Sequence, residues 1–445
     1  MRVTGKLIFI VTALIIIALI IASCASRREA RTNNGSAVNS NAPVERSLPP
    51  LAARPLSAEM KKVRARVVPR VSSLRELPFK NEVGMAELSG WDYGTRTREM
   101  AETLGGDELR TLSKLAAAGG VLPEGTDLAT LAASFAAVSA GAAYSPLDKQ
   151  ILLVGKFKGS ESFLAHEFVH ALQDQHYDLM KMLVVRPYDF DRTEAVFAVV
   201  EGDAVNVQHR FEEGDSYGRK SLDDVARQEA ARFGDYRKEV GQFFPPLLTE
   251  TFIFRYRDGA RFVEAVRRKG GEPGVNGLFA RPPASSEQVL HPEKYFAGEA
   301  PRDVRLSEQA FGAKGWRPVV STPLGEIGVR GLLMAGVSEQ TAARAAAGWG
   351  GDRAYLFDGA NGAPLFVWKT SWDRPVDAEE FYAAYNELQR HRKAAPVGNA
   401  SDGGTRQALW REGKRVTLVR LEGDQVIVIR GAERDVQAAL EAARL

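Results

Sequence analysis

One run of residues in this sequence has the types and spacing that bind a catalytic metal ion, His166-Glu167-Phe168-Val169-His170. Two histidines four positions apart on a helix project from one face about 6 Å apart, so both rings can reach one tetrahedral zinc ion. Glu167 is rotated by about 100° from His166 and can instead reach a water molecule on that ion and take its proton. The alternative interpretation is a helix with two incidental histidines, in a chain that has only six.

A zinc site needs more than two side-chain ligands, so a third must come from another part of the chain. We expect Glu201, in the run VEGDA at 200–204, because gluzincins take this ligand from a glutamate on a downstream helix; Glu194, two turns earlier, is the reserve candidate. His176 stands where metzincins place a third histidine, but those proteins have a glycine where this chain has Gln173. If the helix continues through Gln173, His176 lies about 15 Å along the axis from His166, out of reach.

Other polar residues could support such a site. Asp174 and Asp203 could orient the ligand histidines, whose second N–H usually goes to a carboxylate, or could be solvated or capping residues. Peptide hydrolysis also needs a donor for the developing oxyanion, commonly a histidine or tyrosine across the cleft. His291 is our candidate for this catalytic role, with Tyr256 and Tyr295 as alternatives, although each of the three also fits a structural role.

Hydrophobic periodicity predicts the elements that position these residues. The metal motif falls on an expected helix from Phe163 to Asp174, after a short strand from Gln150 to Val154, and a second helix should run from about Arg192 to Phe211. In zinc peptidases with this motif, such a strand pairs with the extended substrate. Further helices are expected at Ala58–Leu74, Gly105–Ala118, Leu128–Ala140, Ala378–His391 and from Glu433; strands are expected at Ala354–Phe357, Leu365–Thr370, Val416–Leu421 and Gln425–Ile429.

The N-terminus predicts export and a lipid anchor. A short basic start is followed by an apolar run from Leu7 to Ala22, and the segment ends in Ile21-Ala22-Ser23-Cys24. This ending resembles the bacterial lipobox, in which the cysteine is lipidated and becomes the mature N-terminus. Cys24 is the only cysteine, so disulfides are excluded. An uncleaved membrane anchor and an ordinary secretory signal are the alternatives, and residues 24–55 have the composition of a flexible tether.

Length and composition bound the remaining possibilities. A chain of 445 residues suggests two folded units, and 44% apolar residues allow a large core. The formal net charge of +3 includes Arg2 and Lys6 of the extreme N-terminus, so the rest is nearly neutral. This balance gives no support to nucleic-acid binding or to a basic membrane-binding patch.

Three segments together resemble a group of uncharacterised bacterial zincin-like metallopeptidases: HEFVHALQDQHYDL at 166–179, VEGDA at 200–204 and SSEQVLHPEKY at 285–295. The resemblance covers roughly Leu56 to Pro301 and extends more weakly through Trp349-Gly350-Gly351-Asp352, which we interpret as a turn with a packing role. It implies that His166, His170 and Glu201 bind Zn²⁺ and that Glu167 is the catalytic base. The third segment is a family marker with no mechanism attached to it.

We therefore expect an α+β protein with four segments. These are a lipoprotein signal peptide (1–23), the tether (24–55), a mainly helical zincin-like metallopeptidase domain with a short edge sheet (56–301), and a smaller α+β domain of unknown role (302–445). The expected function is zinc-dependent hydrolysis of peptides or proteins at the bacterial cell envelope, where the lipid contacts the membrane. The alternatives are a surface-displayed binding protein on an inactive scaffold, against which the intact Glu167 argues, and a zinc amidase acting on a non-peptide or cell-wall substrate.

Overall fold

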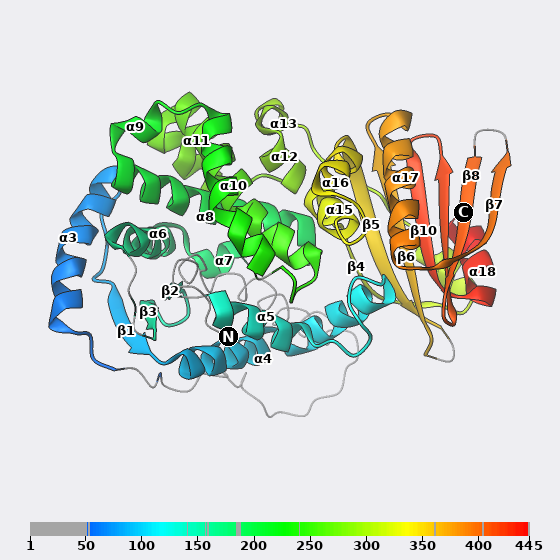
Figure 1. Ribbon diagram of the computed structural model, residues 1–445, viewed down its shortest axis with the longest axis horizontal. Helices are drawn as coiled ribbons and strands as arrows, with labels where there is room; N and C mark the ends of the chain where they lie inside the picture. Colours follow the sequence, from blue (N-terminus) through cyan, green and yellow to red (C-terminus); the bar gives the residue numbers. More distant parts are fainter. Residues whose placement is uncertain are drawn as a thin grey trace, which may run out of the picture.

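A mainly helical part and a large antiparallel sheet lie side by side in the computed structural model (Figure 1). The structure describes residues 51, 54–139, 141–155, 157, 160–183, 188–239, 241–359, 362–402 and 405–443. The predicted mixed α+β class is confirmed. Cys24 and the predicted signal peptide lie outside the described residues. Within the described ranges, no helix combines the length and apolar character needed to cross a membrane.

The helical part contains the metal motif and a small sheet. This sheet has the order β1-β3-β2, with β1 parallel and β2 antiparallel to β3. The predicted strand at Gln150–Val154 is β3, but it is the central strand, and the edge strand beside the motif helix is β2. The elements are α3 (Ala58–Arg75), β1 (Gly84–Leu88), α4 (Gly90–Ala118), α5 (Leu128–Ser139), β2 (Ala142–Ser145), β3 (Gln150–Val154), α6 (Glu161–Tyr177), α7 (Leu179–Leu183), α8 (Phe190–Glu213), α9 (Asp215–Gly218), α10 (Leu222–Glu239), α11 (Pro246–Ala280), α12 (Ser286–Leu290) and α13 (Pro292–Ala297).

The C-terminal part is built on a seven-stranded antiparallel sheet with the order β4-β5-β6-β10-β9-β8-β7. The predicted hairpin is confirmed, since β9 pairs with β10 up to Glu422 and Gln425. The sequence analysis did not predict three strands of this sheet, β4, β7 and β8. The elements are α14 (Glu308–Ala313), β4 (Arg317–Thr322), α15 (Gly325–Leu333), α16 (Glu339–Ala346), β5 (Trp349–Asp358), β6 (Pro364–Trp372), α17 (Pro375–His391), β7 (Ala395–Asp402), β8 (Thr405–Glu412), β9 (Arg415–Glu422), β10 (Gln425–Ala432) and α18 (Glu433–Ala443).

The interpretation of Trp349 to Asp352 as a turn is wrong, because these residues begin strand β5, with a bulge between Trp349 and Gly351. The expected packing role fits the structure. The buried carboxylate of Asp352 accepts hydrogen bonds from the indoles of Trp349 and Trp368 at 3.0 and 2.7 Å and from two backbone N–H groups at the start of α15. Because four donors converge on one carboxylate, this residue joins β5, β6 and the start of α15.

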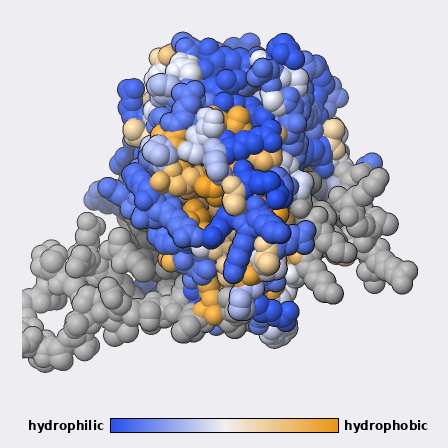
Figure 2. Space-filling model, turned by 90° about the vertical axis from the view of Figure 1, so that its left-hand side faces the viewer, coloured by the Kyte–Doolittle hydropathy of each residue, from blue (hydrophilic) through white to orange (hydrophobic). Residues whose placement is uncertain are grey.

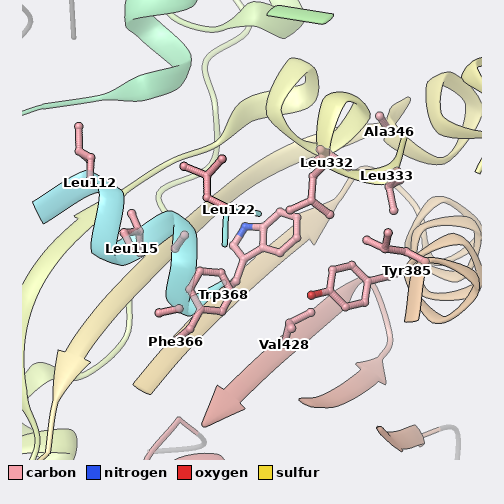
Figure 3. Close-up of a cluster of buried hydrophobic side chains, with 14 of the residues drawn as sticks. Leu112, Leu115, Leu122, Leu332, Leu333, Ala346, Phe366, Trp368, Tyr385 and Val428 are labelled. Atoms are coloured by element: carbon pink, nitrogen blue, oxygen red, sulfur yellow. The ribbon is translucent and has the colours of Figure 1, made fainter. Parts of the chain in front are cut away.

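The largest hydrophobic cluster extends across the predicted boundary at residues 301 and 302. Figure 3 shows Leu112 and Leu115 of α4 next to Phe366 and Trp368 of β6. Leu332 of α15 packs into the same cluster. α4 starts at Gly90, well before its expected start at Gly105, and this length lets it extend from the small sheet to the large one (Figure 1). The two predicted units therefore share a continuous apolar core.

Helix α3 covers the motif helix from outside. Met60 and Val63 of α3, together with Phe79 and Met85, are partly buried against a cluster that includes Phe168 of α6. Figure 2 looks at the end of the molecule where α3 lies and shows hydrophobic residues gathered within a hydrophilic surround. This packing buries one side of α6, which has to be held rigidly if its histidines are to share one ion.

The glycine of the VEGDA run allows α8 and α11 to approach closely. A Cβ atom on Gly202 would overlap with the carbonyl group of Gly259 on α11, and one on Gly259 would overlap with the carbonyl of Ala198 on α8. Only glycine at both positions permits this crossing. The crossing places Glu201, the residue before Gly202, at a fixed position between α6 and α11.

We predict that Gly202→Ala lowers the free energy of unfolding by about 1–3 kcal/mol, because the added methyl group must push two helices apart. Gly277→Ala is the matched control on α11, since a Cβ atom there meets nothing within 4 Å. Removing a helical glycine at that position should be neutral or stabilising by up to about 1 kcal/mol. Urea unfolding of both variants measures the difference, and equal stability would contradict the close crossing.

Candidate metal centre

Helix α6 presents the two motif histidines as the sequence predicts. It begins after Ser160, whose side chain accepts a hydrogen bond from the backbone of Phe163, and it runs without interruption to Tyr177. The helix therefore continues through Gln173, as expected. His176 lies at its exposed end, where its ring contacts the backbone oxygen of Pro78 at 2.8 Å. His176 is thus separated from the cluster formed by His166, His170 and Glu201.

Three atoms of this cluster have the spacing of a zinc coordination shell. His166 Nε2 lies 3.0 Å from His170 Nε2 and 3.2 Å from Glu201 Oε2, and His170 Nε2 lies 3.4 Å from the same oxygen. Ligands about 2.0–2.1 Å from a tetrahedral zinc ion are separated by about 3.3–3.4 Å. The three atoms therefore approximate three corners of such a tetrahedron, and all three side chains are buried.

Hydrogen bonding places the proton of a neutral His170 ring on Nδ1. The Gln173 amide nitrogen donates to Val200 O at 3.0 Å and to Asp203 Oδ2 at 2.9 Å, so its oxygen accepts from His170 Nδ1 at 3.0 Å. A neutral imidazole that donates through Nδ1 carries a lone pair on Nε2. In the neutral ring that lone pair faces the Glu201 carboxylate, an arrangement that a cation between them would stabilise.

The charges of the cluster lead to the same conclusion. Burial lowers the pKa of His170, but the Glu201 carboxylate outweighs burial and raises this pKa to about 9. Burial raises the pKa of Glu201, and the two imidazoles more than reverse this, so it is held well below its usual range. The buried carboxylate therefore requires a positive charge beside it, which a protonated His170 or a metal ion can supply. Two imidazoles and a carboxylate are a ligand set that suits zinc, so these residues fit that ion.

A network of buried polar side chains fixes the orientation of the His170 ring through Gln173. Asp203 accepts from Gln173, and it also accepts from Arg75 Nε at 3.0 Å. Arg75 donates in turn to Glu272 at 2.8 Å. Asp203 therefore acts on a ligand histidine through Gln173, as ring-orienting carboxylates do in metal sites. Asp174 has different partners, because its carboxylate binds the Tyr144 hydroxyl, the Lys149 ammonium and a backbone N–H.

Glu167 is buried beside the cluster and is anchored by one oxygen. Its Oε2 atom accepts the backbone N–H of Tyr144, on edge strand β2, at 2.8 Å. Its Oε1 atom has no hydrogen-bond partner among the described residues, and neither has His166 Nδ1. Burial raises the pKa of Glu167 to about 8, against the opposing effects of His170 and the Tyr144 N–H. A buried carboxylate oxygen without a partner marks a place where a water molecule or a substrate group is expected.

A small cavity borders His166 and Glu167. It encloses about 10 Å³, which is room for about one water molecule. The ring of Tyr256 is stacked on that of His166, with centroids 6.0 Å apart. Arg232 is the one lining residue with appreciable exposure, at 27% of its side chain. The lining residues are Phe163, His166, Glu167, Val205, Gln208, Glu229, Arg232 and Tyr256.

The remaining predicted residues have other partners. Glu194, the reserve ligand, is buried and forms a two-bond ion pair with Arg255, with both N···O distances 2.7 Å. The His291 ring contacts the Glu326 carboxylate at 3.0 Å, and the Tyr295 hydroxyl donates to the Arg281 carbonyl at 3.1 Å. Neither His291 nor Tyr295 lines the cavity. Of the three candidate oxyanion donors, Tyr256 is therefore the one beside the cluster.

The sequence analysis did not identify a cluster of polar residues beside this cavity, formed by His209, Glu229 and Arg232. His209 is buried on α8, and its Nε2 atom lies 2.5 Å from Glu229 Oε1 on α10. Arg232 contacts the same carboxylate at 3.1 Å. The eight-residue interval from Glu201 places His209 two turns later on the same helix face and could have indicated it. No sequence pattern indicated that Glu229 and Arg232 lie at this cavity, because an acidic and a basic residue three positions apart on a helix are common at exposed surfaces.

The SSEQVLHPEKY segment has a structural explanation. Lys294 Nζ lies 2.7, 2.6 and 2.9 Å from the carboxylates of Glu287, Glu299 and Asp373, so a lysine balances this acidic cluster. The backbone N–H of Ser286 donates to Asp191 on α8, and its hydroxyl accepts from the backbone of Ile327 on α15. The segment therefore connects the helical part to the C-terminal part.

The comparisons with known proteins concern the C-terminal part. Residues 271–441 match the model of a family described as "Domain of unknown function (DUF8575)". This range starts within α11 and includes the whole seven-stranded sheet, but it excludes His166, His170 and Glu201. No curated protein and no solved structure matches the chain. A function for this protein has therefore to be inferred from the geometry of its own residues.

Proposed function

We propose that this protein is a zinc-dependent metallopeptidase that hydrolyses peptide bonds with Glu167 as general base. The observation that supports it most is the triangle formed by His166 Nε2, His170 Nε2 and Glu201 Oε2, with sides of 3.0, 3.2 and 3.4 Å. Its dimensions fit three ligands of one tetrahedral ion and leave the fourth position open, as in catalytic zinc sites.

Each nearby residue has a role in the proposed reaction. A zinc ion bound there would lower the pKa of a water molecule and polarise the scissile carbonyl. Glu167 would accept the water's proton on Oε1 and pass it to the leaving nitrogen, while its Oε2 atom stays fixed by the Tyr144 N–H. Tyr256, which lines the same cavity, is the candidate donor for the oxyanion.

The position of strand β2 supports a peptide as substrate. β2 is the edge of the small sheet nearest to the metal cluster, and its Tyr144 N–H points away from β3 to Glu167. In an antiparallel pair every second residue turns its backbone groups outward, so Ala142 presents the same edge as Tyr144. An extended peptide can add to such an edge by backbone hydrogen bonds.

The closed cavity implies that substrate entry requires motion. Helix α10 covers the cavity with Glu229 and Arg232 and packs on α11 through Phe233 and Tyr236, whose rings contact Phe252. A cavity of about 10 Å³ cannot hold a peptide. We therefore propose that α10 is displaced when substrate enters, as covering elements are in many enzymes.

The ligand assignment predicts different effects of two alanine variants. Glu201→Ala should lose most of the bound zinc, because it removes one ligand and the only negative charge in the triangle. His176→Ala should keep zinc near one ion per chain, since this residue lies at the exposed end of α6. Metal analysis of the purified proteins, with circular dichroism as a check of folding, tests the assignment. Zinc loss from His176→Ala alone would contradict it.

The proposed base predicts a variant that binds zinc but does not catalyse. Glu167→Gln keeps the shape of the side chain and removes its basicity, so zinc content should change little. Turnover of a peptide library should fall by about 10²–10⁴-fold, which is the usual contribution of general-base catalysis. Both quantities should be measured on the same preparation. Retained zinc with undiminished turnover would mean that another group activates the water.

We further propose that the protein is exported and anchored to the cell envelope by a lipid on Cys24. The proposal is supported by the basic start, the apolar run and the lipobox-like ending of the N-terminal segment. Cys24→Ser should abolish lipid modification and release the protein from the membrane fraction. Fractionation and mass spectrometry of the N-terminus measure both effects. A membrane-bound, unprocessed variant would instead indicate an uncleaved anchor.

A further inference from the structure

Arg232 stands between solvent and the metal cluster. Seven of the eight residues that line the cavity are buried, whereas the Arg232 side chain is 27% exposed. The cavity has room for only about one water molecule, so its lining groups lie around one small space. His166 and Glu167 border this space from α6, and Arg232 borders it from α10. A group that comes from solvent through this cavity toward Glu167 therefore passes the guanidinium.

The guanidinium is held by one of its three nitrogens. Arg232 Nη1 donates to Glu229 at 3.1 and 3.4 Å and lies 3.4 Å from His209 Nε2. Glu229 is itself buried and fixed by His209 at 2.5 Å. Across the described residues, Nε and Nη2 of Arg232 make no hydrogen bond. These two nitrogens form an edge of the guanidinium that carries two parallel N–H groups.

Such an edge matches the two oxygens of a carboxylate. Arginine binds carboxylates by two parallel N–H···O bonds, a geometry that a single carbonyl oxygen cannot use fully. A donor for the oxyanion is most effective in a site that excludes water, and the partly exposed Arg232 does not meet that condition. The arrangement therefore favours a charged group of the substrate at the entrance over the reacting oxygen at the centre.

We propose that Arg232 is a specificity-determining residue that binds a carboxylate of the peptide substrate next to the scissile bond. The inference rests on the proposed function, because it places this carboxylate relative to Glu167 and the metal cluster. Two sources share this chemistry, namely the C-terminal carboxylate of a peptide and the side chain of an acidic residue near the cleaved bond. Both are within reach once α10 has returned over the bound peptide, since Arg232 and Glu167 border the same small cavity in the closed arrangement.

Calorimetric binding to the full-length, zinc-loaded Glu167→Gln protein tests the proposal without turnover. One pair of probes is N-acetylated tetra-alanine as free acid and as C-terminal amide. The other pair is an N-acetylated tetrapeptide amide with one internal glutamate or one internal glutamine. In at least one pair, the probe with the carboxylate should bind about 10–100-fold more tightly, as expected for hydrogen bonds to a charged group.

Variants of α10 identify the residue responsible. Arg232→Gln should reduce this discrimination to about onefold, and Arg232→Lys, which keeps the charge but not the two parallel donors, should give an intermediate value. Arg227→Gln is the matched control, because it makes the same change at an exposed site on the same helix. Zinc content and thermal unfolding of each variant show whether it is folded, and Arg232→Lys provides the comparison if Arg232→Gln is not.

The outcomes separate this inference from the proposed function. A preference for the free acid identifies a C-terminal carboxylate, and a preference for glutamate identifies an acidic side chain. Equal binding within both pairs, or unchanged discrimination in Arg232→Gln, overturns the role of Arg232. Carboxylate-dependent binding without turnover by the unaltered protein would contradict the peptidase and leave the carboxylate site in place. Turnover without discrimination would contradict only the carboxylate site.

Discussion

The buried Glu201 carboxylate is the constraint on which the rest of the helical part depends. It lies within 3.4 Å of two imidazole nitrogens and is shielded from solvent, so it is stable only beside a positive charge. The proposed zinc ion would supply that charge, and it could bind only if α6 and α8 stay at a fixed separation. The glycine crossing of α8 with α11 and the packing of α3 on α6 maintain this separation.

The surroundings of the cluster are built from buried charges that balance one another. Arg75 joins Asp203 to Glu272, and Arg255 balances Glu194. Breaking a buried pair by removing one partner commonly costs about 3–5 kcal/mol, so these networks limit how the helices can move. Helix α10 is tied to α8 by the buried pair of Glu229 and His209. Because α10 covers the cavity with Glu229 and Arg232, its proposed displacement would have to break or carry this pair.

The C-terminal part supports the helical part without contributing to the metal cluster. Helix α4 packs against the large sheet in one continuous core, Asp352 fixes the start of α15, and Lys294 joins three carboxylates from both sides of the predicted boundary at residues 301 and 302. The matched family range, residues 271–441, describes this sheet and says nothing about zinc. Proposals for the metal centre and for the sheet therefore need separate experiments.

Local patterns in the sequence determined the parts of the site that lie within one or two helices. The four-residue interval of His166 and His170, the continuation of α6 through Gln173 and the helix carrying Glu201 all follow from helical periodicity. Tertiary structure alone decided the remainder. The bonds from Tyr144 N–H to Glu167, from Gln173 to Asp203 and from Arg75 to Glu272 join residues 23, 30 and 197 positions apart. Local sequence patterns do not predict such pairings. The pairings form only when separate elements pack together and a buried polar group must find a partner. For the same reason the sequence alone suggests a surface position for Arg232. This residue comes to line the cavity beside the metal cluster only when α10 packs over that cavity.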